Sequence, residues 1–412
     1  TARALGEDLR RYIQDLPITA KRPGIAKRVV KFVKRRKAPV IAVTAVVLLC
    51  AAGLLIVHEQ KARREANRQQ LVAQIAALRE SGMFFAHNKK WSEAEPEFRK
   101  ALDIDPDDVE TLLSLAWTKL EYHKAEPAIA GKPALIEAEL AARRVVDQNP
   151  SGAEQLGKAL ALQGVALRRL NRYPEAVVKF EQCVQVAPEM YHNWSNLGAL
   201  HVLNKDLENA ERCLWEGAKR AGLETKDEWH AAPWRNLASF ELFLQKSDAM
   251  VHINTAIELY DQDVLTSVIQ SRIQLELKDH INVRAALDNA KHADRVGKSK
   301  NPRAKRILAL AHLRNKQLDD AVKEARAAIE LKDLATPNQL IIAVAEAIQG
   351  RVAAAREALK AAEAAWPKEL REPGGFTASA ETGDLWIESA DGLIQLKNEA
   401  DAAIAGTSGS PP

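Results

Sequence analysis

The sequence has little of what marks a disulfide-rich, fibrous or all-β protein. Three cysteines in 412 residues cannot form a disulfide framework, so the fold must depend on packing. Glycine (19 residues) and proline (17 residues) are too scarce for collagen-like or low-complexity chains. Aromatic residues make up only 5%, while alanine, leucine, glutamate, lysine and arginine dominate. These are strong helix formers, so the composition predicts an all-α fold.

Motifs of catalytic and metal sites are also missing. The sequence contains no H-E-x-x-H, no G-x-S-x-G and no G-x-x-x-x-G-K-[ST]. The spacing of Cys183, His192, His201 and Cys213 matches no common zinc pattern. We expect Cys183 and Cys213 to be buried free thiols, with a disulfide between them as the alternative. The prediction is therefore a protein with no catalytic residue, no cofactor and no metal ion.

Neither sign of charge dominates the chain as a whole, but the charge is unevenly distributed. The net charge is +4, whereas residues 1–37 alone carry twelve Lys or Arg and three Asp or Glu. Residues 38–412 therefore have a net charge of −5. A mildly acidic main part argues against nucleic-acid binding there.

One long hydrophobic run interrupts the charged sequence, from Ala38 to Val57. None of its 20 residues is charged, and a helix of that length rises about 30 Å, the thickness of a bilayer core. A buried core helix is the alternative, and a signal peptide is excluded because 37 residues precede the run. The sequence predicts a single transmembrane helix.

The flanking charges predict the orientation of this helix. Nine Lys or Arg and no acid lie between Lys21 and Lys37. By the positive-inside rule, this arm is expected in the cytoplasm and the rest outside, in the periplasm of a Gram-negative cell. We therefore predict a single-pass protein of the inner (cytoplasmic) membrane. We expect the arm to lie on anionic lipid headgroups, with a nucleic-acid patch as the alternative.

A repeated pattern with a period of about 34 residues follows the hydrophobic run. One such period separates Gly164 from Gly198, and the same spacing separates Ala176 from Ala210. Gly82 begins an earlier copy of the pattern. The pattern resembles the tetratricopeptide repeat, in which each unit is a pair of antiparallel helices that stacks on the next. The resemblance implies an α-solenoid of about eight helical hairpins and a function in protein interaction.

The repeated glycines are expected where two helices approach closely. Gly198 lies on the first helix of the clearest unit, and the second helix carries Ala210 opposite it. We expect alanine at position 198 to be tolerated, because it adds only a methyl group, and leucine to be destabilising.

These patterns divide the chain into six parts. We predict a basic juxtamembrane segment at 1–37, the transmembrane helix at 38–57, a helical stalk at 58–74, the repeat superhelix at 75–367, a break with a capping helix at 368–404 and a disordered tail at 405–412. Within the superhelix, Pro127, Gly131 and Pro133 predict a loop or a broken helix in the second unit. The capping helix is expected over 384–404, with Trp386 in it.

A stack of hairpins has a concave groove, lined by the first helix of each hairpin. We expect Lys158, Arg168 and Arg169 to form a basic cluster there that binds a peptide carboxylate, with a solvated helix face as the alternative. Some tetratricopeptide proteins clamp a C-terminal carboxylate with a Lys, Asn, Lys and Arg set across three consecutive repeats, and this chain lacks the full set. By helical spacing, the candidate peptide-binding residues are Arg79, Met83, Lys158, Arg168, Arg169, His192, Ser195, Asn196, Arg235 and Ser239.

The N-terminal segment carries a second resemblance. It reads L-G-E-D-L-R-R-Y-I from Leu5 to Ile13 and L-P-I-T-A-K-R-P from Leu16 to Pro23, before the basic stretch and the hydrophobic run. This order resembles the segment after the kinase domain in bacterial membrane-anchored serine/threonine protein kinases with C-terminal tetratricopeptide repeats. The chain has no Gly-rich loop, no H-R-D and no D-F-G, so no kinase activity is predicted for it. A kinase domain would have to precede Thr1.

Two hypotheses for the function follow. The first is a membrane-tethered scaffold or sensor module, the extracytoplasmic part of a serine/threonine kinase signalling protein that binds a protein or peptide in its groove. The second is a kinase-less membrane scaffold that assembles an envelope protein complex. A third, an enzyme with an unrecognised site in the groove, has no motif to support it. Nothing in the sequence specifies the ligand or the oligomeric state.

Overall fold

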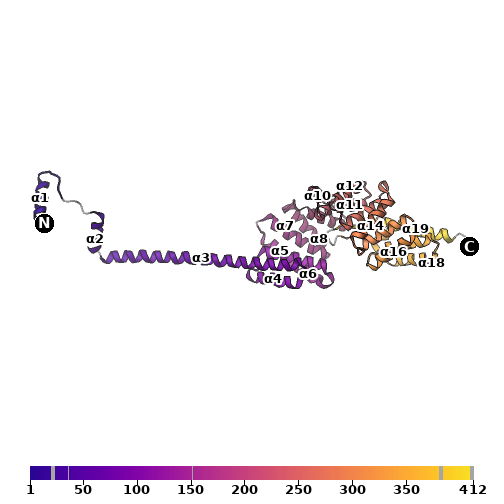
Figure 1. The fold of residues 1–412 in the computed structure, drawn as a ribbon, viewed down its shortest axis with the longest axis horizontal. Helices are drawn as coiled ribbons and strands as arrows, with labels where there is room; N and C mark the ends of the chain where they lie inside the picture. The colour runs from indigo at the N-terminus through magenta and orange to yellow at the C-terminus, as the bar shows by residue number, and fades with distance from the viewer. Residues whose placement is uncertain (20–23, 36, 151, 380–383, 409–412) are drawn as a thin grey trace. The chain divides into compact units, whose positions relative to one another are not determined.

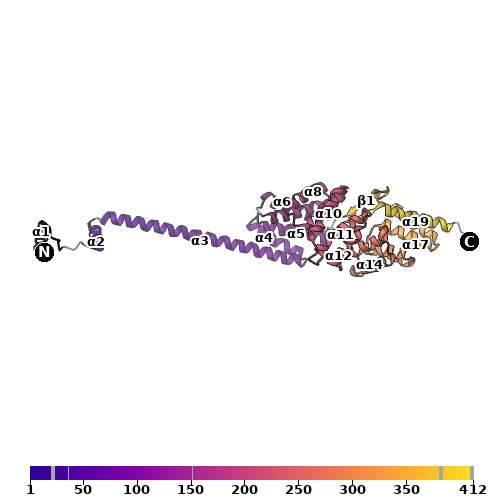
Figure 2. The same cartoon turned by 90° about the horizontal axis from the view of Figure 1, so that it is seen from above.

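The computed structural model describes residues 1–19, 24–35, 37–150, 152–379 and 384–408. The chain divides into two units, Thr1–Ala76 and Ala77–Pro412, and each is described by itself. Figures 1 and 2 show the helices of both units in two views.

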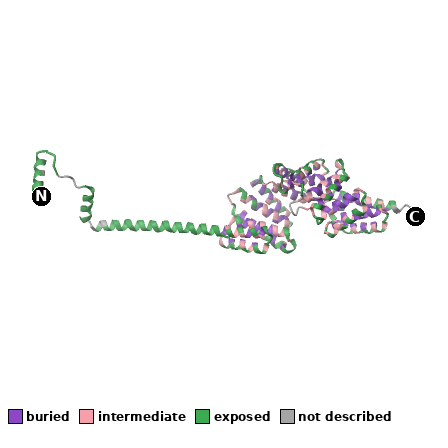
Figure 3. Ribbon diagram, viewed as in Figure 1, coloured by how far each residue is buried: buried purple, intermediate pink, exposed green. Residues whose placement is uncertain are grey.

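The first unit consists of exposed helices. α1 (Ala2–Ile13) and α2 (Ile25–Arg35) precede α3 (Lys37–His87), which continues beyond the unit. No side chain with a described position is buried before Ile75 (Figure 3). From Ile41 onward, α3 is long and apolar enough, by length and composition, to cross a membrane. The helix has no break between this apolar stretch and its end at His87.

The second unit is a stack of eight helical hairpins over the described residues. The first hairpin pairs the end of α3 with α4 (Trp91–Ile104), through contacts such as that between Gly82 and Phe98. The other seven pair consecutive helices: α5 (Val109–Ala125) with α6 (Pro127–Gln148), α7 (Ala153–Arg169) with α8 (Tyr173–Val186), α9 (Tyr191–Leu203) with α10 (Leu207–Ala221), α11 (Glu228–Phe243) with α12 (Asp248–Leu259), α13 (Val264–Glu276) with α14 (Val283–Val296), α15 (Pro302–Arg314) with α16 (Leu318–Glu330), and α17 (Ala335–Ile348) with α18 (Val352–Ala364). The predicted all-α solenoid of about eight hairpins is confirmed.

A left-handed residue closes the turn inside several of these hairpins. Asn171 and Lys205 have φ angles of 61° and 63° and lie at the same position of successive repeats. The Asn171 backbone N–H donates to the Arg168 carbonyl over 3.0 Å, which satisfies one of the carbonyls that the helix end leaves open. The repeat therefore recurs in the turns as well as in the packed helix faces.

The repeated glycines lie where the two helices of a hairpin touch, as expected. A Cβ atom at Gly82, Gly164 or Gly198 would lie 2.7 Å from a side chain of the partner helix. At Gly198 that neighbour is Leu214 Cγ, and the Leu214 backbone nitrogen is only 3.0 Å away. The expectation that alanine fits at position 198 is therefore wrong, because the closest group is Leu214 and part of it is rigid backbone.

The second hairpin contains the predicted interruption. Gly131 has φ 55° and ψ −166°, a conformation that L-residues rarely adopt, and it kinks α6 between Pro127 and Pro133. The broken helix predicted from these three residues is confirmed.

The C-terminal end differs from the prediction. Trp386 lies in strand β2 (Trp386–Ser389), which pairs antiparallel with β1 (Phe376–Ser379), and not in a helix. The capping helix, α19 (Ala390–Ser408), starts six residues later than expected and packs against α17 and α18. Tryptophan and isoleucine favour an extended backbone, and the Ser389 hydroxyl accepts from the Asp391 N–H over 3.2 Å, so the helix begins after Ser389.

Two short 3₁₀ helices, η1 (Lys278–His280) and η2 (Lys368–Leu370), complete the described elements. The predicted tail at 405–412 is helical as far as Ser408, and residues 409–412 lie outside the described residues. Of the predicted break, residues 380–383 also lie outside them.

Cys183 and Cys213 are buried free thiols, as expected. Burial raises the pKa of Cys183 to about 12, so this thiol is uncharged and unreactive at neutral pH. Among the described residues, no group of three or more His, Cys, Asp or Glu side chains is placed to hold a metal ion.

Candidate peptide-binding groove

The predicted groove residues of the first hairpin contact the neighbouring hairpin. Arg79 on α3 forms an ion pair with Asp108 over 3.6 Å, and both side chains are about a quarter exposed. Asp108 also caps α5, because its carboxylate accepts from the Thr111 N–H over 2.9 Å. Met83 is half-buried and packs against the core of the first two hairpins. Both residues therefore have a structural contact in this conformation.

The basic cluster expected from Lys158, Arg168 and Arg169 does not form as a unit. Lys158 is exposed and pairs with Glu154 over 2.6 Å on its own helix. Ten residues of helix separate it from Arg168, a rise of about 15 Å, so the expectation that the three cations act together is wrong.

Arg168 and Arg169 do lie at the end of α7 that borders the groove. Arg168 is buried and donates to Asn196 Oδ1 over 3.4 Å, and Arg169 donates to the Leu120 carbonyl over 2.6 Å. With Lys124 and the β1 residue Ser379, they line a cavity of about 410 Å³. The strand pair therefore borders the groove at this hairpin.

His192 belongs to an aromatic cluster at the start of α9. Its ring lies 4.0 Å from the Tyr191 ring and 5.5 Å from the Trp229 ring, measured between centroids. Burial, together with the nearby His230, lowers the pKa of His192 to about 4, so the imidazole is neutral at pH 7. Trp229 is 66% exposed, so the cluster reaches the surface of the protein.

The predicted residues on α9 and α11 form a buried polar layer. Ser195 accepts a hydrogen bond from Asn236 Nδ2 over 3.0 Å. Arg235, which is 2% exposed, forms ion pairs with Asp263 and Asp384. Asp263 is itself fixed, because it caps α13 by accepting from the Thr266 N–H over 3.0 Å. Arg235 thus joins two hairpins to a residue near the C-terminus.

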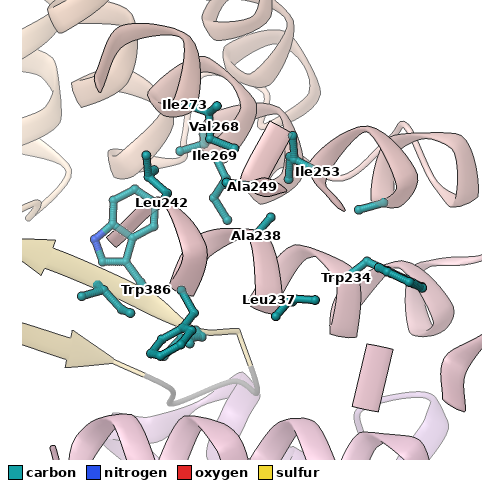
Figure 4. Close-up of a cluster of buried hydrophobic side chains, with 14 of the residues drawn as sticks. Trp234, Leu237, Ala238, Leu242, Ala249, Ile253, Val268, Ile269, Ile273 and Trp386 are labelled. Atoms are coloured by element: carbon teal, nitrogen blue, oxygen red, sulfur yellow. The ribbon is translucent and has the colours of Figure 1, made fainter. Parts of the chain in front are cut away.

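The groove of the later hairpins is occupied by the chain's own C-terminal segment. β1 contacts α9 and β2 contacts α11, so the strand pair lies on the first helices of these hairpins. Figure 4 shows the Trp386 side chain extending from the strand pair toward Leu242 of α11. An extended segment therefore covers part of the surface at which the sequence predicts an external peptide.

Arginines from two helices surround the Trp386 indole. The guanidinium carbons of Arg272, Arg303 and Arg306 lie 4.7, 4.9 and 5.3 Å from its ring centre. Such cation–π contacts are attractive, and they are stronger where water is excluded. The indole N–H donates to Glu388 Oε2 over 3.0 Å, so the polar edge of the ring is also satisfied.

Charged and backbone contacts hold both ends of β2. The Leu385 N–H donates to Asn236 Oδ1 over 2.9 Å, and Arg272 donates to the Ile387 carbonyl over 3.1 Å. Arg306 binds Glu388 Oε2 over 2.8 Å. The segment is thus recognised through its main chain as well as through its side chains.

The electrostatics of the site follow from these contacts. Burial raises the pKa of the Glu388 carboxyl, but the charges of Arg306 and Arg272 outweigh burial and hold that pKa below its ordinary value. Burial and the neighbouring Arg306 charge both lower the pKa of Arg303. The helices therefore present a concentration of positive charge, and the carboxylates of the segment compensate it.

Ser239 lies beside this segment. Its hydroxyl is buried without a hydrogen-bond partner among the described residues, and it lines a cavity of about 590 Å³ with Arg272, Arg306 and Glu388. The segment therefore does not fill the groove completely.

Sequence reasoning missed four of the residues that hold the segment: Asn236, Arg272, Arg303 and Arg306. The hairpin at 264–296 has a degenerate form of the repeat pattern, so the spacing does not indicate which of its residues face the groove. A signal existed, because Arg272 and Arg306 are one full repeat period apart. Trp386 itself was expected in a helix, which hid its role.

Comparison with known proteins supports the repeat assignment. A sequence model of the tetratricopeptide repeat family matches residues 282–335, which include α14, α15 and α16. No match was found among curated protein sequences. The described hairpins form a tetratricopeptide-type solenoid.

A solved structure shows the same fold at low sequence identity. The chain is similar to the Cut9–Hcn1 hetero-tetramer of APC/C, with 16% identity and a TM-score of 0.50; the match covers 79% of this chain and 55% of that one. It is also similar to PilF of Pseudomonas aeruginosa, with 17% identity and a TM-score of 0.42, over 55% of this chain and 93% of that one. This chain thus spans about half the length of the first of these proteins.

Proposed function

We propose that the chain is a membrane-tethered protein-interaction module whose tetratricopeptide solenoid binds an extended peptide segment. One observation carries this proposal: the inner face of α11, α13 and α15 already holds an extended strand through main-chain and side-chain contacts. A surface that makes such contacts to one extended segment has the chemistry to bind another.

The membrane tether is supported by the apolar start of α3 and by the helix before it. The side chains of Ile41–Val57 are exposed, which costs free energy in water and none in a bilayer. On α2, Ile25, Val29 and Phe32 are exposed and share one helix face, while five Lys and Arg residues occupy the opposite face. Such a helix fits the surface of an anionic membrane beside the span.

The orientation and the kinase association belong to the same proposal. The basic residues before Ala38 support a cytoplasmic N-terminus and a periplasmic solenoid in the inner membrane. The order of the segments from Leu5 to Val57 supports the extracytoplasmic sensor or scaffold part of a bacterial serine/threonine kinase signalling protein. In that role the solenoid binds a protein outside the cytoplasm and the span connects it to the inside.

The orientation of the chain in the membrane and the binding of a protein in the groove can be tested in the same membranes. A reporter fused after Ala405 is expected to be active only outside the cytoplasm, and the chain to stay with membranes after a high-salt wash. A photo-reactive residue at Gln245, which is exposed beside the groove cavity, is expected to cross-link a protein partner. The matched control is Val251, which is 60% exposed on the second helix of the same hairpin. Cytoplasmic reporter activity, or equal cross-linking from both positions, would contradict the proposal.

A further inference from the structure

The segment Asp384–Glu388 is held in the way in which a protein holds a ligand. The residues that contact it lie far away in the sequence, 149 residues for Arg235 and Asp384 and 82 residues for Arg306 and Glu388. They come from three separate hairpins, whose helices pair with one another independently of the segment. Within the described part of the chain, the strand itself pairs only with β1, in a two-stranded sheet.

The contacts define a sequence pattern. In an extended strand alternate side chains point to the same side, so Trp386 and Glu388 of β2 share one side, and Asp384, two residues before the strand, pairs with Arg235. These three side chains contact arginines. Leu385 and Ile387, each 2% exposed, enter the hydrophobic core, to which the Trp386 ring also belongs. The groove therefore selects an acidic residue, a tryptophan and a second acidic residue at alternate positions, with aliphatic residues between them.

The charges of the helices agree with this pattern. Arg235, Arg272 and Arg306 each retain an acidic partner within the hairpins and their connections, namely Asp263, Glu276 and Asp333. Arg303 adds a fourth cation beside Trp386, and the carboxylates of the segment balance the excess. Without the segment, Arg235 would lose its ion pair with Asp384 and Arg306 would lose its ion pair with Glu388, which favours an acidic ligand.

The segment does not fill the groove completely, so an external peptide that fills it better can displace the segment. The cavity of about 590 Å³ next to β2 contains the Ser239 hydroxyl, which has no partner among the described residues, and is bordered by Arg272 and Arg306. An external ligand of the same pattern with additional side chains can fill that space and gain contacts that the chain's own segment does not make.

We propose that Asp384–Glu388 is an internal ligand mimic, and that the groove across α11, α13 and α15 binds acidic–x–Trp–x–acidic peptides in its place. The inference rests on the proposed function only in assuming that the partner binds in the groove. A tethered segment competes at an effective concentration of order millimolar, so the external peptide binds weakly until the internal segment is weakened.

Peptide binding to the full chain in detergent micelles tests this directly. The probe is a fluorescent peptide with the sequence of residues 384–389, D-L-W-I-E-S. Trp386→Ala weakens the internal segment and leaves the groove intact, so the peptide should bind at least about tenfold more tightly than to the wild type. Glu388→Gln preserves side-chain shape and should give a smaller gain in affinity. Circular dichroism confirms that each variant is folded.

Two controls distinguish specific recognition of the peptide from non-specific binding. The peptide D-L-A-I-E-S should not bind, and adding Arg272→Gln to Trp386→Ala should remove most of the gain, whereas adding Arg79→Gln should not. Equal affinity of the wild type and both segment variants, or equal binding of the peptide without tryptophan, would overturn the inference. If the peptide does not bind but a protein is still cross-linked through Gln245, only the proposed acidic and tryptophan-containing ligand is rejected. Peptide binding without a protein cross-linked through Gln245 in membranes rejects only the protein partner of the proposed function.

Discussion

The two halves of the solenoid satisfy the polar side chains of their inner face in different ways. In the N-terminal half, partners come from the neighbouring hairpin. Arg79 pairs with Asp108, and Gln163 donates to Glu139 over 2.8 Å, so each pair joins one hairpin to the next. These contacts follow the nearest-neighbour pattern of repeat proteins, in which each unit depends on the next.

In the C-terminal half, the end of the chain supplies additional partners. Arg235 binds Asp384, and Arg306 binds Glu388, with Trp386 between them. One short segment therefore connects three hairpins at once. We expect the C-terminal hairpins to unfold together, because loss of the segment exposes buried arginines in all three.

The largest expected effect compares one arginine from each half. Arg235→Ala removes a cation that is 2% exposed and leaves the partly buried Asp263 and Asp384 without it, so it should lower the free energy of unfolding by about 3 kcal/mol. Arg79→Ala breaks a partly exposed pair and should cost about 1 kcal/mol or less. Urea unfolding of both variants, followed by circular dichroism, measures the difference.

Equal losses for the two variants would contradict the contrast between the halves. Hydrogen exchange locates the effect, since Arg235→Ala should speed exchange in α11, α13 and α15 more than in α5 and α7.

A smaller effect compares the same repeat position in adjacent hairpins. Gly198 and Ala238 each follow a Trp-x-x-Leu sequence, and at Gly198 a backbone atom of the partner helix lies 3.0 Å from where a Cβ would be. Gly198→Ala should cost about 1 kcal/mol net, because overpacking exceeds the gain in helix propensity. Ala238 is fully buried, so Ala238→Gly should cost about 1–2 kcal/mol, through lost helix propensity and the loss of a buried methyl group.

Gly392→Ala in α19 is the control, because a Cβ there meets nothing within 4 Å. It should be neutral or stabilising in the same thermal melt. A Gly198→Ala variant with a melting temperature at or above that of the wild type would show that the helix pair can separate.

The parts of this fold that depend on local patterns could be predicted from the sequence. The repeat spacing of Gly164 and Gly198 indicates the hairpins, and Pro127 and Pro133 with Gly131 indicate the kink in α6. These features require only that neighbouring residues pack or turn in a fixed way.

The groove could be predicted only in part, because its occupant comes from elsewhere in the chain. Spacing placed Arg235 and Ser239 on the inner face, but nothing local indicates that Trp386 docks among arginines of distant hairpins. The expected cluster of Lys158 with Arg168 fails for a simpler reason, because ten positions along one helix separate the two side chains. Long-range pairing depends on which surface remains uncovered after the hairpins form, and local propensity carries no information on that.

The smallest expected effect is the pH dependence of segment docking. The arginine charges around Glu388 lower its pKa below the ordinary 4.5 in the folded state, in spite of burial. A carboxyl with a lowered folded pKa contributes stability above its unfolded pKa and loses it as the pH falls through the folded value. In the wild type, this contribution is therefore complete at pH 7 and declines below about pH 4.5.

The variant Glu388→Gln isolates this contribution, because glutamine has the same shape and does not titrate in this range. The variant should be less stable than the wild type at pH 7, and the difference in unfolding free energy should shrink as the pH is lowered from 6 toward 3. Other carboxylates titrate in both proteins and cancel in the difference. A difference that stays constant over this range would mean that Glu388 is not ionised in the folded protein, and the contact with Arg306 would then be a neutral hydrogen bond instead of an ion pair.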